Sequence, residues 1–208
     1  MRRTLIPIIV LILLVAAGVY YSLRNRSQSQ RLIVSGTIEA TQIHVGSQLG
    51  GLAEEVYAAE GQTVAKGDIL AEVRPAAGVP SGYTDPVRSP INGVILARVV
   101  EPGEICAPGG TLFTVADLSS VTLTVYVPEA RYGQINLGQT IPVTVDSFPE
   151  RIFTGTVTYI ADQAEFTPRN VQTVQGRKDT VYAMHLTLDN PDLALKPGMP
   201  ADAELAAQ

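Results

Sequence analysis

Hydrophobic and polar residues alternate with a period of two along much of the C-terminal half, as they do in strands that bury one face. The clearest run is V-T-L-T-V-Y-V at 121–127, which places four aliphatic residues on one side. Pro128-Glu129-Ala130 predicts a short helical turn, and Gly138 and Pro197-Gly198 predict turns before further strands. No stretch of this half has the pattern of a long amphipathic helix. Several short strands separated by turns predict a small β-barrel. Its expected strands lie near 121–127, 141–145, 153–160, 181–188 and 201–205.

The N-terminal half contains the same strand-and-turn pattern twice, at Ser47–Val73 and Ser89–Val115, with a constant offset of 42 residues and no gap. Three pairs of glycines coincide under this offset, and we expect them in tight turns that need a positive φ. Each copy is too short to bury its own face, so the two halves should pack together as one β-sandwich. The paired glycines are Gly51 with Gly93, Gly61 with Gly103, and Gly67 with Gly109.

The chain begins with an apolar run from Leu5 to Leu23, 19 residues without a charge. This length suffices for a transmembrane helix across a hydrocarbon core of about 30 Å. A cleaved signal peptide is the alternative, because Val15-Ala16-Ala17 offers small residues at a cleavage site. The run continues past that point, which favours an uncleaved anchor. Arginines flank the run on both sides, so charge does not fix its orientation.

Charge is distributed unevenly. The residues up to Arg31 include five basic and no acidic side chains, whereas the remainder has 10 basic and 20 acidic ones. So acidic a chain has no long-range attraction for nucleic acid or for anionic lipid. The single Cys106 excludes an internal disulfide. It stands where the first repeat has Val64, so we expect it to act as a small buried apolar group.

The repeat resembles the biotinyl/lipoyl-type domain, a flattened barrel of two quasi-symmetric halves. Carrier domains of that type present a modifiable lysine where the halves meet. The junction here, 74–88, contains no lysine, and the only lysine in either repeat, Lys66, stands before a turn glycine. We therefore expect no covalent cofactor, and a carrier subunit ranks third among the functions considered.

The order of motifs along the chain resembles the HlyD-type membrane fusion proteins, the periplasmic adaptors of exporters, and most of all the branch that serves ABC-type exporters. The motifs are V-S-G-T-I-E-A-T-Q-I-H-V, A-D-L-S-S-V-T-L-T-V-Y-V-P-E, T-G-T-V-T-Y-I, A-E-F-T-P-R-N-V-Q-T and L-K-P-G-M-P-A-D-A-E-L. The resemblance implies an inner-membrane transporter as partner and a homo-oligomeric ring. It also implies that most of the chain lies outside the cytoplasm.

One feature departs from that family. Most members insert a coiled-coil hairpin between the lipoyl halves, whereas only 15 residues join them here, and Pro75, Pro80 and Pro86 interrupt any helix. The chain is therefore a variant without the hairpin, and it cannot reach an outer-membrane duct by that route.

These observations predict an all-β protein with one N-terminal transmembrane helix, a lipoyl-like flattened barrel and a small β-barrel. The expected parts are a tail (1–4), the transmembrane helix (5–23), a linker (24–31), a strand entering the β-barrel (32–45), the lipoyl-like domain (46–117, with halves 47–73 and 89–115 and junction 74–88) and the β-barrel (118–208).

Candidate chemistry is sparse, and no catalytic, cofactor or metal site is expected. His44 and His185 lack neighbouring ligands at metal-binding spacing. The acidic pairs Glu54-Glu55 and Asp162/Glu165 lack an adjacent nucleophile or oxyanion loop, so a solvated surface explains them better than acid–base catalysis. Partner contacts are the remaining candidates: Tyr83 in the junction, and Arg177 and Lys178 in a polar stretch.

The predicted function is a membrane-anchored adaptor subunit of an export system, docked on an ATP-driven transporter. A non-transport envelope scaffold or sensing module with the same two domains is the alternative.

Overall fold

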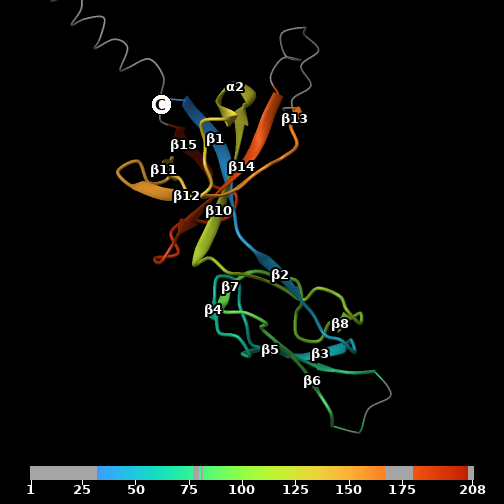
Figure 1. The fold of residues 1–208 in the computed structure, drawn as a ribbon. Coiled ribbons are helices and arrows are strands. Elements are labelled where there is room, and N and C mark those ends of the chain that lie inside the picture. The colour runs from blue at the N-terminus through green and yellow to red at the C-terminus, as the bar shows by residue number, and fades with distance from the viewer. Residues whose placement is uncertain (1–31, 77–79, 81, 167–179, 206–208) are drawn as a thin grey trace, which may run out of the picture.

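The computed structural model describes residues 32–76, 80, 82–166 and 180–205. Within these residues the protein is all-β apart from α2 (Glu129–Tyr132), and it forms two modules, one after the other along an elongated molecule (Figure 1). The strands are β1 (Leu32–Glu39), β2 (Gln42–Val45), β3 (Gly51–Val56), β4 (Thr63–Val64), β5 (Ile69–Arg74), β6 (Asp85–Arg88), β7 (Gly93–Arg98), β8 (Ile105–Cys106), β9 (Phe113–Ala116), β10 (Ser120–Pro128), β11 (Thr140–Val145), β12 (Ile152–Ile160), β13 (Glu165–Phe166), β14 (Thr180–Asp189) and β15 (Pro200–Leu205).

One module is a closed six-stranded barrel, built from β1 and five strands of the C-terminal half. Its strand order is β10-β1-β15-β11-β12-β14, and β10 pairs with β14 to close it. The short β13 pairs with the first two residues of β14, which extend beyond its pairing with β12. The alternation in β10 predicted the inward face correctly, because Val121, Leu123, Val125 and Val127 are all at most 1% exposed. Closure leaves these six strands without a free edge, which removes a common route to aggregation.

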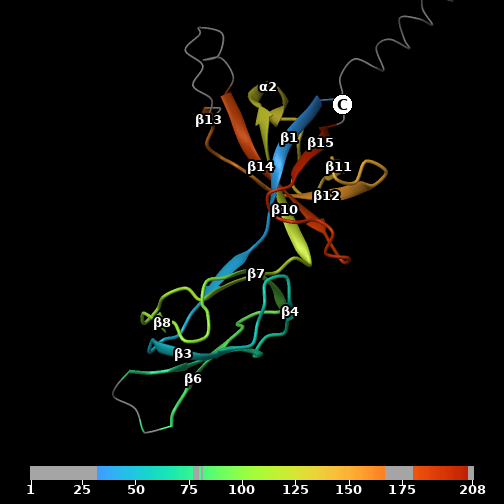
Figure 2. The same cartoon turned by 180° about the vertical axis from the view of Figure 1, so that it is seen from behind.

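The segment expected to be one strand, 32–45, is two strands in different sheets. β1 pairs with β10 and β15 in the barrel, whereas β2 pairs with β9 in the other module. The strand direction breaks at Ala40-Thr41, where the chain leaves the barrel, and the backbone N–H of Asp117 donates to the carbonyl of Thr41 there. Two chain segments therefore connect the modules side by side (Figure 2).

The second module is a sandwich of two four-stranded sheets, β2-β9-β7-β4 and β6-β5-β3-β8. Leu70, Ile95 and Phe113 fill its core and are fully buried. Residues 85–88 of the predicted junction form β6, which pairs only with β5. Pro86 is tolerated in it because an edge strand can lack a donor on one side. The hydroxyl of Ser47 donates to the Asp85 carboxylate at 2.6 Å and so ties β6 to the core.

The two halves of the sandwich exchange equivalent hydrogen bonds across a pseudo-twofold axis. The turns of each half donate backbone hydrogen bonds to the other half, in addition to the bonds that they make internally. This is the mutual packing that the shortness of each repeat predicts. The matched bonds are Gly67 N to Ser89 O (2.8 Å) with Gly109 N to Ser47 O (2.9 Å), and Gly61 N to Ile95 O (2.8 Å) with Gly103 N to Ala53 O (2.7 Å).

Two glycines expected in turns, Gly51 and Gly93, instead begin strands β3 and β7. A Cβ on Gly51 would lie 2.1 Å from the carbonyl oxygen of Arg74, and one on Gly93 would lie 2.3 Å from that of Ala116. Close approach of a neighbouring strand therefore explains these two glycines, and Gly51 also has φ +133°. The positive φ values of the other paired glycines and of Gly198 lie between +73° and +96°.

We expect Gly51→Ala to lower the free energy of unfolding by more than the ~1 kcal/mol typical of point changes, because the new Cβ meets backbone that cannot move aside. Gly133→Ala is the matched control, since Gly133 has φ −67° and open space around it. Urea unfolding of the purified chain measures both. Equal stability of the two variants would show that the strands can separate locally at no cost.

The modules meet through a small apolar cluster of their own. Val94 and Ala116 of the sandwich pack with Leu118 of the connection and with the partly buried Leu193 of the barrel. Asn190, fully buried, fixes the loop that carries Leu193: its amide donates to the carbonyls of Leu118 (2.8 Å) and Leu195 (2.9 Å) and accepts from Leu195 N–H.

Candidate interaction surfaces

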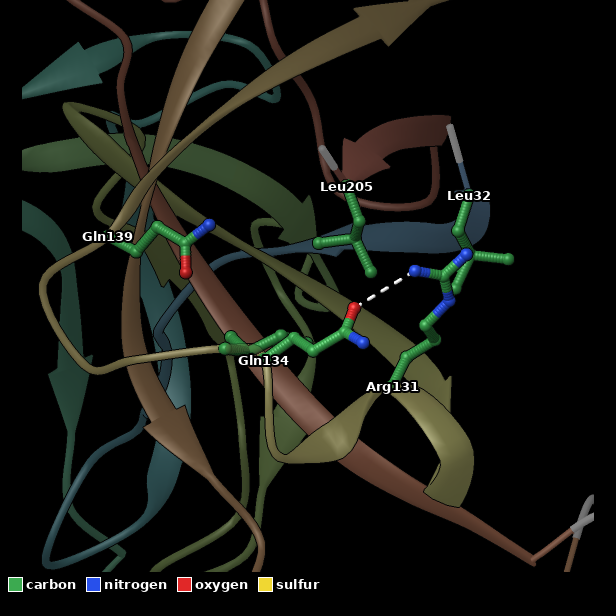
Figure 3. Close-up of a pocket in the computed structure, with 6 residues that line it drawn as sticks. Leu32, Arg131, Gln134, Gln139 and Leu205 are labelled. Atoms are coloured by element: carbon green, nitrogen blue, oxygen red, sulfur yellow. Dashed lines mark hydrogen bonds between the residues drawn. The ribbon is translucent and has the colours of Figure 1, made fainter. Parts of the chain in front are cut away.

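The barrel end remote from the sandwich is closed by α2. Strand β10 ends at Pro128, and α2 then lies across the barrel mouth. Figure 3 shows the small cavity beneath it, about 10 Å³, with Leu32 and Leu205 on one side. The guanidinium of Arg131, in α2, donates to the side chain of Gln134, in the turn that follows, at 2.9 Å. A space of this size holds about one water molecule at most. The barrel end is therefore a closed core and not a ligand pocket.

The same end displays apolar side chains to solvent. Ile33 in β1 is 62% exposed, and Leu137, in the loop that follows α2, is 66% exposed. Tyr132 of α2 packs on Tyr182 of β14 with ring centroids 4.2 Å apart, which holds α2 against the barrel wall. A rigid rim with exposed apolar residues is suited to contact another protein.

The opposite end of the molecule is the tip of the sandwich, near β3, β6 and β8 (Figure 1). Ile105 is 85% exposed there, and Leu49 is 46% exposed. Tyr83, a predicted contact residue, is 42% exposed, and its N–H donates to the carbonyl of Pro80 at 3.2 Å. The other two predicted contact residues, Arg177 and Lys178, lie outside the described residues.

The acidic pairs do not form a catalytic arrangement in the described part of the chain. Glu54 makes an ion pair with Arg74 at 2.7 Å. A hydrogen bond to Glu55 raises the pKa of Tyr57 to about 12. Asp162 is exposed, and Glu165 lies in β13. Glu55, Asp162 and Glu165 are exposed and Glu54 is half-buried, so these carboxylates lie at the surface.

The two histidines lie apart. His44 Nδ1 contacts the hydroxyl of Thr114 at 3.2 Å, and the ring of His185 packs against Tyr159 at 4.8 Å. Among the described residues no three His, Cys, Asp or Glu side chains gather as a metal site would require.

The lysine and the cysteine singled out in the repeats have structural surroundings. Lys66 is exposed, and its backbone N–H donates to the Asn92 side chain at 2.9 Å. Cys106, in the edge strand β8, is only half-buried, whereas its counterpart Val64, in the equivalent edge strand β4, is buried. Its thiol contacts the carbonyl of Gly51 at 3.3 Å.

Two family models match consecutive parts of the chain. Residues 41–117 match the CzcB-like barrel-sandwich hybrid domain, and residues 120–208 match the CusB-like β-barrel domain. These ranges correspond to the sandwich and to the barrel without its first strand, β1.

A membrane protein encoded in the asrC 5′ region of Acidithiobacillus ferridurans is 38% identical over 117 residues. That match takes in 56% of this chain and 35% of the relative, so the chain corresponds to about a third of that protein.

No helix in the described part of the chain is long and apolar enough to span a membrane, and the predicted segment 5–23 lies outside that part.

Two solved structures share the fold. ZneB from Cupriavidus metallidurans superposes with a TM-score of 0.67 at 20% identity, over 86% of this chain and 98% of that one. The membrane fusion protein Spr0693 from Streptococcus pneumoniae R6 gives 0.58 at 14% identity, over 85% and 100%. The sandwich, the barrel and their order agree with both family models, and β5 leads to β6 without an inserted helical pair. The chain therefore belongs to the membrane fusion (periplasmic adaptor) proteins, in a form that lacks the helical hairpin.

Proposed function

We propose that this protein is the membrane-anchored adaptor subunit of an export system, and that its barrel end docks on an inner-membrane, ATP-driven transporter. The observation that carries this proposal is the position of Leu32. It is the first described residue after the predicted anchor, and it lines the capped barrel end beneath α2.

Covalent reach limits how far this barrel end can lie from the membrane. The predicted anchor ends at Leu23, and only the linker 24–31 separates it from Leu32. An extended chain spans at most about 3.6 Å per residue, so the barrel end lies within ~30 Å of the anchor. The exposed Ile33 and Leu137 then face a transporter in the same membrane.

The tip of the sandwich points the other way along the molecule. Without a hairpin between β5 and β6, it cannot extend a coiled coil toward a distant outer-membrane duct. We expect several copies to surround the exit path of the transporter, and their action to be mechanical. Adaptors of this kind contribute no catalytic residues, so the energy comes from the partner.

The type of transporter rests on the sequence resemblance, which favours the ABC class. The matched barrel model is named for RND systems, so an RND pump is the alternative partner. Affinity purification of the full-length protein from its native membranes distinguishes the two. We expect an ATPase and its permease to co-purify and to show ATP hydrolysis that vanadate inhibits. Co-purification of a pump without a nucleotide-binding subunit would favour the RND partner.

The topology of the chain gives a separate prediction. A reporter fused after Gln208 should be active only outside the cytoplasm, because adaptors of this family carry the bulk of the chain there. The apolar run from Leu5 to Leu23 is long enough to remain in the membrane as an anchor. Fractionation should retain the protein with its N-terminus intact. A soluble product beginning near Gly18 would show that the run is a cleaved signal peptide.

A further inference from the structure

A cavity of about 300 Å³ lies where the two modules meet. Its floor is apolar and comes from both modules, because Leu118 and Val94 are nearly buried and Leu193 reaches over from the barrel. Its rim is polar and exposed. The lining residues are Thr63, Asn92, Gly93, Val94, Asp117, Leu118, Ser119 and Leu193.

The walls of this junction cavity are held in place by the fold. Leu193 has φ +51°, the only positive φ of a non-glycine residue in the described ranges. Its N–H donates to the carbonyl of Asn190 at 3.0 Å, and Asn190 is itself buried and fully bonded. A non-glycine residue in a left-handed conformation costs free energy, and such residues cluster at functional sites.

The rim offers one charged group, the carboxylate of Asp117. One of its oxygens, Oδ1, accepts from both the N–H (2.9 Å) and the hydroxyl (2.6 Å) of Ser119. The hydroxyl bond in particular lowers the pKa of Asp117, so the group is ionised near neutral pH. In the described part of the chain the second oxygen, Oδ2, has no partner, and no lysine or arginine lines the cavity.

We propose that this junction cavity binds a small organic cation with a short apolar body, with its ammonium group on Asp117 Oδ2 and its body against Val94, Leu118 and Leu193. The volume lies at the lower limit of ligand pockets, about 300–1,000 Å³, and junctions between domains are a preferred place for them. An anion is disfavoured by the carboxylate. A metal ion is disfavoured because the lining provides a single acidic ligand.

Such an occupant would touch both modules at once, since Thr63 and Asn92 belong to the sandwich and Leu193 belongs to the barrel loop. Binding would therefore stabilise one relative arrangement of the modules, because a ligand favours the conformation that it contacts best. The proposal does not depend on which transporter the barrel end docks on.

The test uses the full-length protein in detergent with methyl-labelled leucine, and three probes of similar shape: cyclohexylammonium, cyclohexanol and cyclohexanecarboxylate. We expect cyclohexylammonium alone to shift the Leu118 and Leu193 methyl signals in a saturable way. Asp117→Asn should weaken its binding about tenfold or more, because a charge-assisted hydrogen bond is lost. Asn keeps the bonds to Ser119, so the turn should survive.

Asp162→Asn is the matched control, an exposed aspartate away from the cavity, and should bind like the wild type. Leu193→Asn should weaken binding too, because it removes an apolar wall while Asn tolerates the left-handed backbone. Equal affinity for the three probes, no saturable shift, or equal binding by the Asp117 and Asp162 variants would each overturn the proposal. The comparison of the three probes uses the unaltered chain, so it tests the proposal even if a variant fails to fold.

Discussion

Asn190→Ala is expected to lower the free energy of unfolding by about 3 kcal/mol or more, because it leaves buried carbonyls of Leu118 and Leu195 and the N–H of Leu195 without partners, each costing ~1–3 kcal/mol. The loss should appear in urea unfolding followed by circular dichroism. It should be accompanied by faster proteolysis between the modules, because the same side chain fixes the barrel loop that contacts the connection.

Asn136→Ala is the control for this change, since Asn136 is exposed and should alter stability by no more than about 0.5 kcal/mol. Similar unfolding curves for the two variants would mean that water replaces the Asn190 amide, and that the junction is less rigid than its hydrogen bonds indicate.

Val125→Asp is expected to prevent the barrel from folding. Val125 is fully buried and pairs with Met184 across the β10–β14 contact that closes the barrel. An unpaired carboxylate there costs several kcal/mol unless it is protonated or the strand shifts. The soluble yield and the near-ultraviolet dichroism of the purified chain measure the effect, and co-purification with the transporter should fall with them.

The neighbouring change Tyr126→Asp tests the alternation that underlies this prediction. Tyr126 is 36% exposed on the outer face of the same strand, so its replacement should leave a folded barrel. A folded Val125→Asp variant, or equal damage from both changes, would contradict the assigned faces of β10.

The sequence predicted the parts of the fold that depend on local pattern. Alternation identified the inward face of β10, and the 42-residue offset identified the two sandwich halves, whose hydrogen bonds repeat with the same offset. Both signals are local, because burial of one strand face and the demands of a tight turn are decided within a few residues.

The pairing of distant strands was not predictable in the same way. No local sequence pattern indicates that β10 pairs with β14 to close the barrel, or that the strand expected at 32–45 divides between two sheets. β6 was missed because Pro86 normally argues against a strand, and only its position at a sheet edge makes it acceptable. Tertiary packing decides each of these features.

The junction cavity could not be predicted from the sequence for a related reason. Its lining comes from four separate stretches of chain. One of them, 117–119, lies in the motif A-D-L-S-S, but that motif predicts the connection to the barrel and not a cavity. The one local signal was Asn190-Pro191, a dipeptide that marks turns. It indicates a turn but gives no sign that the Asn side chain is buried between two modules.

Site-specific photo-cross-linking in native membranes tests the central claim most directly. A photoreactive residue at Leu137, on the rim of the barrel end, is compared with one at Ile105, at the tip of the sandwich; both side chains are well exposed. If the barrel end docks on the transporter, the Leu137 probe should capture a transporter subunit and the Ile105 probe should not. Capture of that subunit from Ile105 alone would show that the protein binds its partner in the opposite orientation, and would contradict the proposed function of the barrel end.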